Sequence, residues 1–257
     1  MREFSAGDPH PNQGAHDHVK PYVHEGLDSR SLHFSISEIQ SRMQIRRPDV
    51  LELEYTRTMM GFLMFKPQPE RVAMIGLGGG SLAKFCHRHL PRTSLVVVEI
   101  NPHVIALRDT FQVPPDDARF QVVEADGARF VRETESRFDV LMVDAFDAQG
   151  MPATLGSRRF YDDGLDALRP GGLLVVNLHT GHPHFPVYLD RIRRSFGEHV
   201  LRVDDSSNSA IFACKGERLQ RAGSGPLRRP ATLAPEPWEQ LQGAFARVAG
   251  ALQRLAL

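Results

Sequence analysis

The stretch from Arg71 to Glu99 constrains the fold of this chain more than any other. It reads RVAMIGLGGGSLAKFCHRHLPRTSLVVVE: an apolar run, a glycine-rich turn, a helical segment and a second apolar run that ends on an acid. Glycines let a ligand approach the backbone closely, and here they stand at Gly76, Gly78 and Gly80. An acid about 20 residues further on is placed to bind ribose hydroxyls. The stretch therefore predicts a nucleotide-binding βαβ unit, with Glu99 at the tip of its second strand.

The composition fits one α/β domain with a small addition. The chain has 257 residues, of which 41% are hydrophobic and 24% charged, ordinary values for a soluble globular protein. Its formal net charge is zero, so we expect neither nucleic acid nor an anionic membrane as a partner. The two cysteines, Cys86 and Cys214, predict buried thiols in a reducing compartment. Residues 1–30 lack an apolar signal core, so the expected location is the cytoplasm.

The chain divides into four segments of different character. Residues 1–18 are polar and rich in Pro, Gly and His, which predicts a disordered tail. Residues 19–68 predict a small N-terminal β-hairpin followed by a helix. Residues 69–216 alternate between strand and helix patterns and form the expected nucleotide-binding catalytic domain. Residues 217–257 read as a linker and an amphipathic C-terminal helix, which packs on its own domain or on a dimer partner.

Within the N-terminal segment, two strands are expected at Leu32–Ile36 and Ile39–Ile45, with a turn at Ser37-Glu38. Apolar residues then recur at helical spacing over 51–65. In the main segment, seven strand candidates lie at 71–77, 94–100, 119–125, 138–144, 172–178, 198–204 and 209–215. Five βα repeats that end in a hairpin predict a Rossmann-like, mostly parallel sheet with one antiparallel strand. This is the layout of S-adenosylmethionine (SAM)-dependent transferases rather than of most NAD dehydrogenases.

Acids stand at the carboxyl ends of successive predicted strands. Glu99 ends the second strand, Asp126-Gly127 follows the third, and Asp144 ends the fourth, with Asp147 in the loop after it. Ligands bind beyond the carboxyl ends of an open parallel sheet. We expect Asp126 to accept a hydrogen bond from an adenine amino group, with Gly127 allowing the close approach. The alternative for each acid is a cap of a helix or turn.

Asp144 and Asp147 would then face the reacting end of the nucleotide. Two neighbouring carboxylates attract a cationic amine and raise each other's pKa, so that one can act as a general base. A sulfonium centre is an electrophile that needs no metal. The pattern predicts alkyl transfer from a sulfonium nucleotide to an amine, with no metal ion. The three histidines that follow the fifth strand have no regular ligand spacing and are expected to form a polar loop: His179, His182 and His184.

From about Ser31 to Gly216 the chain resembles the spermidine synthase (polyamine aminopropyltransferase) family. The resemblance is carried by the glycine loop, the acid strand, the D-G pair, the D-S-S-D catalytic loop and the F-Y and L-R-P-G-G signals after it. In this chain these are Ile75 to Gly80, Glu99-Ile100-Asn101, Asp126-Gly127, Asp144-Ala145-Phe146-Asp147, Phe160-Tyr161 and Leu168 to Gly172. Upstream, the family's D-G-x-x-Q hairpin is similar to Ser37-Glu38-Ile39-Gln40.

The resemblance implies transfer of an aminopropyl group from decarboxylated SAM to an amine, with release of methylthioadenosine. It implies that Asp144 accepts the proton and that Asp147 and Tyr55 bind the amine. It also implies a homodimer, formed through the N-terminal hairpin or the terminal helix. The implied nucleotide site consists of Gln40, Gly76, Gly78, Gly80, Glu99, Asp126 and Gly127.

Two departures from the family pattern leave alternatives open. Gly79 stands where the family has an Asp that meets the amino end of decarboxylated SAM and repels the carboxylate of SAM, and Thr56 stands where it has His or Gln. A SAM-dependent methyltransferase and a 3-amino-3-carboxypropyltransferase therefore remain alternatives, both with SAM as the donor. A non-catalytic nucleotide-binding protein is a third alternative, against which the presence of both Asp144 and Asp147 argues.

Overall fold

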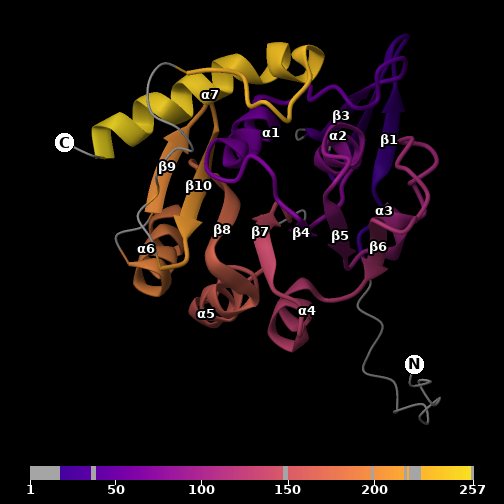
Figure 1. Cartoon of the computed structure of the whole chain (residues 1–257). Helices are drawn as coiled ribbons and strands as arrows, with labels where there is room; N and C mark the ends of the chain where they lie inside the picture. The colour runs from indigo at the N-terminus through magenta and orange to yellow at the C-terminus, as the bar shows by residue number, and fades with distance from the viewer. Residues whose placement is uncertain are drawn as a thin grey trace, which may run out of the picture.

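A computed structural model describes residues 18–35, 39–146, 150–197, 200–216, 219 and 227–255 of the chain. Its centre is a seven-stranded sheet in the order β6-β5-β4-β7-β8-β10-β9 (Figure 1). The strands are β4 (Arg71–Ile75), β5 (Ser94–Glu99), β6 (Phe120–Glu124), β7 (Phe138–Val143), β8 (Leu168–His179), β9 (Val200–Asp204) and β10 (Asn208–Cys214). Among these strands β10 alone runs opposite to the other six, which confirms the expected mostly parallel sheet with one antiparallel strand.

Helices cover both faces of this sheet because its strands are apolar on both sides. In β4, Val72 and Met74 join the core on one face, and Ala73 and Ile75 join the core on the other. The first face is covered by α1 (Glu54–Met59), the 3₁₀ helix η1 (Met60–Met64), α2 (Ser81–His89) and α7 (Pro235–Leu255). The second face carries α4 (Gly127–Glu133), α5 (Arg158–Ala167) and α6 (Phe185–Phe196), and the short α3 (Pro102–Ile105) follows β5.

The N-terminal region forms a separate antiparallel sheet, β1-β2-β3, with strands β1 (Tyr22–Glu25), β2 (Ser29–His33) and β3 (Ile39–Gln44). The predicted hairpin is present as β2 and β3, but β1 was not predicted. Its four residues, YVHE, show no clear alternation, and only pairing with β2 defines them as a strand. The predicted turn at Ser37-Glu38 and residues 1–17 of the predicted tail lie outside the described residues.

The C-terminal helix packs on its own chain, which is one of the two arrangements expected for it. Helix α7 lies along α1, η1 and β9 (yellow in Figure 1). Its buried side chains include Leu241, Phe245 and Val248. The close approach requires a glycine in η1, since a Cβ on Gly61 would lie 2.8 Å from Val248 Cγ2. Leu255, predicted for the same apolar face, is exposed.

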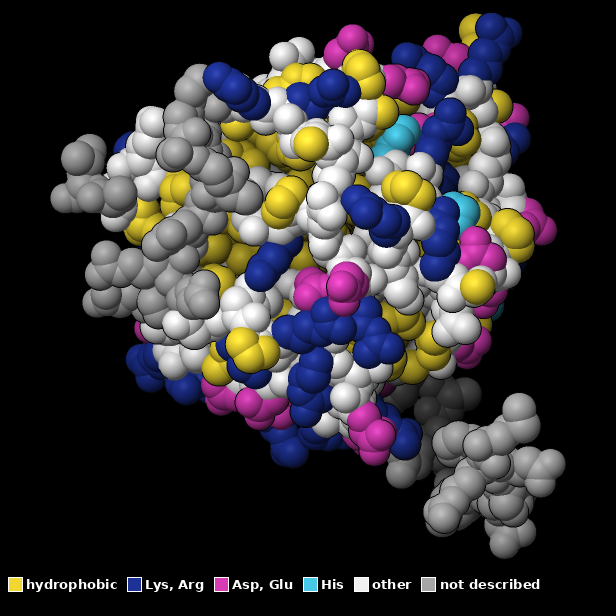
Figure 2. Space-filling view, viewed as in Figure 1, with side chains coloured by type: hydrophobic (Ala, Val, Ile, Leu, Met, Phe, Trp, Pro, Cys, Tyr) yellow, Lys and Arg dark blue, Asp and Glu magenta, His cyan; other side chains and the backbone are white. Residues whose placement is uncertain are grey.

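The surface charges are interspersed rather than separated. On the face shown in Figure 2, basic and acidic side chains lie among one another. Along the helices, opposite charges stand one helical turn apart, as in Arg129–Glu133, Arg158–Asp162 and Arg194–Asp190. The described residues contain no helix long and apolar enough to cross a membrane.

Candidate active site

A pocket of about 930 Å³ opens at the carboxyl ends of the parallel strands. Its wall is built by the β2–β3 sheet, the start of α1, the glycine loop, the ends of β5, β7 and β8, and the β9–β10 hairpin. The acids at the strand ends meet there because parallel strands place their carboxyl ends along one edge of the sheet. The lining includes Glu99, Asp126 and Asp144, so three of the four predicted acids share one cavity.

Glu99 is buried and held by backbone N–H groups on both sides. Its Oε2 accepts a hydrogen bond from the N–H of Leu77 in the glycine loop, and its Oε1 accepts one from Asn101, both at 2.9 Å. Each carboxylate oxygen can accept a second hydrogen bond. The Glu99 carboxylate thus joins the end of β5 to the glycine loop and keeps acceptor capacity for a ligand in the pocket.

Asp126 serves as the N-cap of α4, the alternative considered for it, since its Oδ1 accepts a hydrogen bond from Arg129 N at 2.7 Å. It also lines the pocket, where its Oδ2 is free of that bond. For Gly127 the structure gives a different reason from the predicted one. A Cβ there would lie 2.4 Å from Ile75 Cγ2, so packing against β4 requires the glycine, whatever approaches from the pocket.

The glycines of the loop have different tasks. Gly76 has φ +97°, and a Cβ on it would lie 2.1 Å from the carbonyl oxygen of Asp144, so this glycine lets the two loops cross. Gly78 also has a positive φ, and it lines the pocket together with Gly76. Among the residues that the structure describes, Gly79 and Gly80 do not line the pocket. A Cβ on Gly80 would lie 2.5 Å from Val113 Cγ2, so packing also requires a glycine there, and its contact with the nucleotide stays a prediction.

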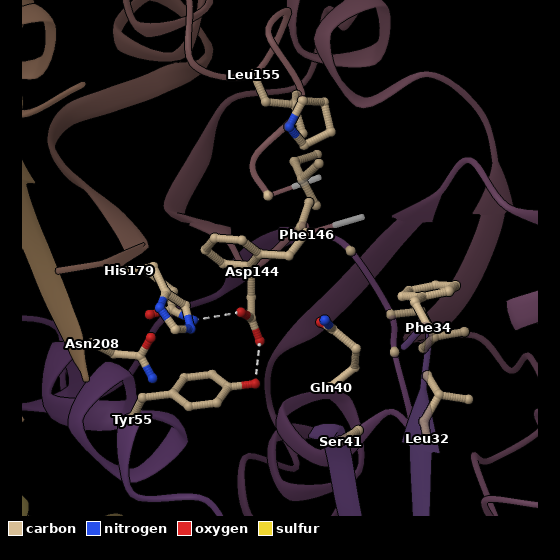
Figure 3. A pocket seen from close by; sticks show the side chains of 18 of the residues that line it. Leu32, Phe34, Gln40, Ser41, Tyr55, Asp144, Phe146, Leu155, His179 and Asn208 are labelled. Carbon is tan, nitrogen blue, oxygen red and sulfur yellow. Dashed lines mark hydrogen bonds between the residues drawn. The ribbon is translucent and has the colours of Figure 1, made fainter. Parts of the chain in front are cut away.

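Asp144 lies directly after β7 and is held by two side chains from distant parts of the chain. Tyr55 Oη, from α1, donates a hydrogen bond to Oδ2 at 3.2 Å, and Asn177 Nδ2, from β8, donates one to Oδ1 at 2.9 Å (Figure 3). Burial raises the pKa of Asp144, an effect that these two donors partly offset. Burial, with the nearby charge of Asp144, also raises the pKa of Tyr55. A carboxylate with a raised pKa, facing a pocket, is suited to accept a proton.

The remaining predicted residues are placed as follows. Gln40, from β3, lines the pocket and extends into the space between Asp144 and Phe34 in Figure 3. Asp147 lies outside the described residues, so its position next to Asp144 stays a prediction. Thr56 lines the pocket wall, but its hydroxyl donates to the carbonyl of Leu53 at the start of α1.

The histidines after β8 form ring contacts. His182 and His184 lie 5.4 Å apart between ring centroids, and both contact the Tyr188 ring. His179 meets the Phe146 ring edge-on at 6.0 Å. Within the described residues, no three His, Cys, Asp or Glu side chains are grouped so that they could hold a metal ion.

The pocket lining also contains polar residues that were not predicted as site residues, among them Asn177, Asp205 and Asn208. The sequence carries a signal for Asn177, the one polar residue inside the apolar stretch LLVVNL near the end of β8. Asp205 and Asn208 lie in DDSSN, which reads as an ordinary hairpin loop. Only the pairing of β8 with β10 brings this hairpin to the pocket.

Comparison with known proteins shows the family of the chain. A family model described as spermine/spermidine synthase domain matches residues 52–191, more than half of the chain. The polyamine aminopropyltransferase of Chromobacterium violaceum is 37% identical over 194 residues, which are 74% of this chain and 74% of that protein.

Solved structures share the fold at lower identity. A probable spermidine synthase from Corynebacterium glutamicum superposes with a TM-score of 0.68 at 19% identity, covering 81% of this chain and 82% of that one. Human methyltransferase-like protein 13, solved with SAH, gives a TM-score of 0.57 at 21% identity, with 78% and 93% covered. The fold alone therefore does not separate aminopropyl from methyl transfer, but the family model and the curated relative do. The chain belongs to the spermine/spermidine synthase family.

Proposed function

We propose that this chain transfers an aminopropyl group from decarboxylated SAM to an amine and releases methylthioadenosine. The observation that carries the proposal is the half-buried Asp144 carboxylate, held by Tyr55 and Asn177 in the same pocket as the glycine loop and Glu99. One end of the pocket thus offers a nucleotide site and the other a base. Family membership favours this reaction over methyl transfer.

The reaction follows from the chemistry of these groups. An acceptor arrives as an ammonium ion and loses one proton to Asp144, which burial makes a stronger base than an exposed Asp. The freed nitrogen lone pair attacks the propyl carbon bonded to the sulfonium. A carbon–nitrogen bond forms as the carbon–sulfur bond breaks, and its electron pair neutralises the sulfur. Tyr55 and Asn177 orient the carboxylate for the proton transfer.

The donor is proposed to be decarboxylated because the reacting end of the pocket is acidic. Asp144, Asp205 and Glu54 all line the pocket. A donor that still carried its carboxylate would meet these negative charges at close range, whereas the ammonium of an aminopropyl group would be attracted. Asp147 is proposed to assist in binding the amine, as the family resemblance implies.

The proposal extends to a cytoplasmic homodimer. The thiol of Cys86 is buried, and burial raises its pKa to about 12. Such a thiol is compatible with a reducing compartment. Exposed apolar side chains on the N-terminal sheet and its turns, Tyr22, Leu27 and Ile39, offer a surface for a second copy. Light scattering on the purified protein tests this: we expect twice the monomer mass, and a monomeric mass contradicts the dimer.

Product identification by mass spectrometry tests the reaction. The purified chain is incubated with SAM or decarboxylated SAM, each with a panel of mono- and diamines. We expect methylthioadenosine and an amine that has gained an aminopropyl group, from decarboxylated SAM only. Methylated acceptor with S-adenosylhomocysteine, or an aminocarboxypropyl product from SAM, would overturn the proposed donor and reaction.

A further inference from the structure

We propose that residues His18 to Pro21, hereafter the N-terminal strap, form one wall of the nucleotide site, and that Val19 contacts the thioadenosine. Asn101 holds the strap in place. The inference rests on the proposed function and adds to its nucleotide site a segment that the sequence pattern places at the end of a polar tail. Val19 thereby has a binding role, and Asn101 has a positioning role.

The strap reaches the pocket because of the direction of β1. Tyr22, the first residue of β1, pairs with His33 at the end of β2, so the residues before Tyr22 continue past β2 toward Phe34, which lines the pocket. Pro21 is buried and has no N–H to donate, so the ladder of β1 starts after it. The first two residues of the strap belong to the pocket lining themselves.

Asn101 ties the strap to the acid of the nucleotide site. Its Nδ2 donates a hydrogen bond to the carbonyl oxygen of Val19 at 2.9 Å, and its backbone N–H donates to Glu99 Oε1 at 2.9 Å. Its Oδ1 accepts from the N–H of His103 and so caps α3, which lies next to β1 in Figure 1. Asn101 is buried. One side chain thus fixes the strap beside the carboxylate that is expected to bind the ribose.

The contact between Asn101 and the strap requires an amide at this position. The helix cap alone does not, because Asp and Ser cap a helix about as well as Asn. The carbonyl oxygen of Val19 only accepts, so its partner must donate, whereas the cap must accept. An amide carries both groups, but an ionised carboxylate at this place would set an acceptor against an acceptor. The strap therefore accounts for the choice of Asn.

Two apolar side chains remain exposed on the pocket wall on either side of this contact. Val19 is 45% exposed and Ile100, which lies between Glu99 and Asn101, is 44% exposed, and both line the pocket. Apolar surface in water is unfavourable, so a ligand that covers it gains affinity. Thioadenosine offers a flat base and a thioether for such a wall, while its hydroxyls face Glu99. The exposed side chains thus fit the chemistry of the proposed nucleotide.

Isothermal titration of methylthioadenosine into the full chain tests the binding role. We expect Val19→Ser to weaken binding about 3- to 10-fold, because part of a valine side chain is no longer buried as apolar surface. Lys20→Ser is the matched control, since Lys20 is adjacent in the strap, is exposed and does not line the pocket. It should leave the dissociation constant unchanged.

A double variant tests the positioning role. Asn101→Ser keeps a cap for α3 but loses the amide that holds the strap, and should weaken methylthioadenosine binding about 3- to 10-fold with little change in melting temperature. If Asn101 acts by placing Val19, then Val19→Ser should add little further loss in the Asn101→Ser chain. Losses that multiply would show that the two residues act separately and would overturn the positioning role.

Hydrogen exchange supplies a readout that a purely structural strap would not move. Methylthioadenosine should slow exchange of the backbone N–H groups of the strap in the wild type, and less so in Asn101→Ser. Slowed exchange in the glycine loop with none in the strap would overturn the inference. Intact methylthioadenosine binding without any aminopropyl product contradicts only the proposed reaction, whereas equal dissociation constants for Val19→Ser and the wild type contradict only the strap wall.

Discussion

At the nucleotide end of the pocket the carboxylates are held by backbone N–H groups, whereas at the acceptor end Asp144 is held by side chains. Glu99 is fixed by Leu77 and Asn101, and Asp126 by Arg129, all close to the strand ends. Asp144 depends on Tyr55 and Asn177, which lie 89 and 33 residues away. A backbone N–H donor remains when the side chain of its residue is substituted. A side-chain donor is lost by a single substitution. The acceptor end is therefore the part that the chain can most easily alter.

Loss of the base is expected to have the largest effect. Asp144→Asn should lower kcat by about 10²- to 10⁴-fold, since general-base catalysis contributes on that order. Binding of methylthioadenosine should survive, because the nucleotide end has its own contacts. Steady-state kinetics and calorimetry measure the two quantities, and full activity of the variant would show that Asp144 is not the base.

At the nucleotide end, Glu99→Gln should weaken methylthioadenosine binding by about 1–3 kcal/mol. The substitution removes the negative charge and replaces one accepting carboxylate oxygen by an NH2 group, which only donates. Glu124→Gln is the matched control. Glu124 pairs with Glu99 in the β5–β6 register, is exposed and does not line the pocket. Equal dissociation constants for the two variants would place the ribose elsewhere.

Restoring the family's acid in the glycine loop tests how rigid the nucleotide end is. A Cβ on Gly79 would lie 2.6 Å from Ser41 Oγ and 2.9 Å from Phe111 Cδ1. Gly79→Asp is thus expected to destabilise the fold by about 1–3 kcal/mol through overpacking, rather than simply to change donor choice. Gly243→Asp, which places the same side chain in open space, is the control in denaturant unfolding. Equal stability of the two would mean that the loop adapts.

The smallest expected effect concerns the donor to the base. Tyr55 lowers the pKa of Asp144 by its hydrogen bond, so Tyr55→Phe should raise that pKa further. Asp144 works in its ionised form, and activity at the acid side of the profile should therefore shift to higher pH. We expect kcat near pH 7 to fall about 2- to 10-fold, in line with one hydrogen bond, and to recover partly at higher pH. A uniform loss across pH would indicate that Tyr55 acts only on the amine.

The order of apolar runs determined the sheet and the nucleotide end of the site. Strands such as 71–77 and 94–100 are recognisable because each is buried on both faces, and parallel pairing then brings Glu99, Asp126 and Asp144 to one edge. These features depend on residues close together in the chain, which is why they can be predicted from it.

Only the tertiary structure decided the acceptor end. At the glycine loop too, the space beside Gly79 depends on the tertiary structure, since a Cβ there would meet Ser41 and Phe111 from other segments. The burial of Asn208 and Asp205 depends on how the hairpin pairs with β8. The ion pair between Arg247 and Glu54 depends on how α7 lies on α1. A polar loop has the same sequence whether it faces solvent or a pocket. What distinguishes the two is which partners it finds, and those partners are distant in the chain.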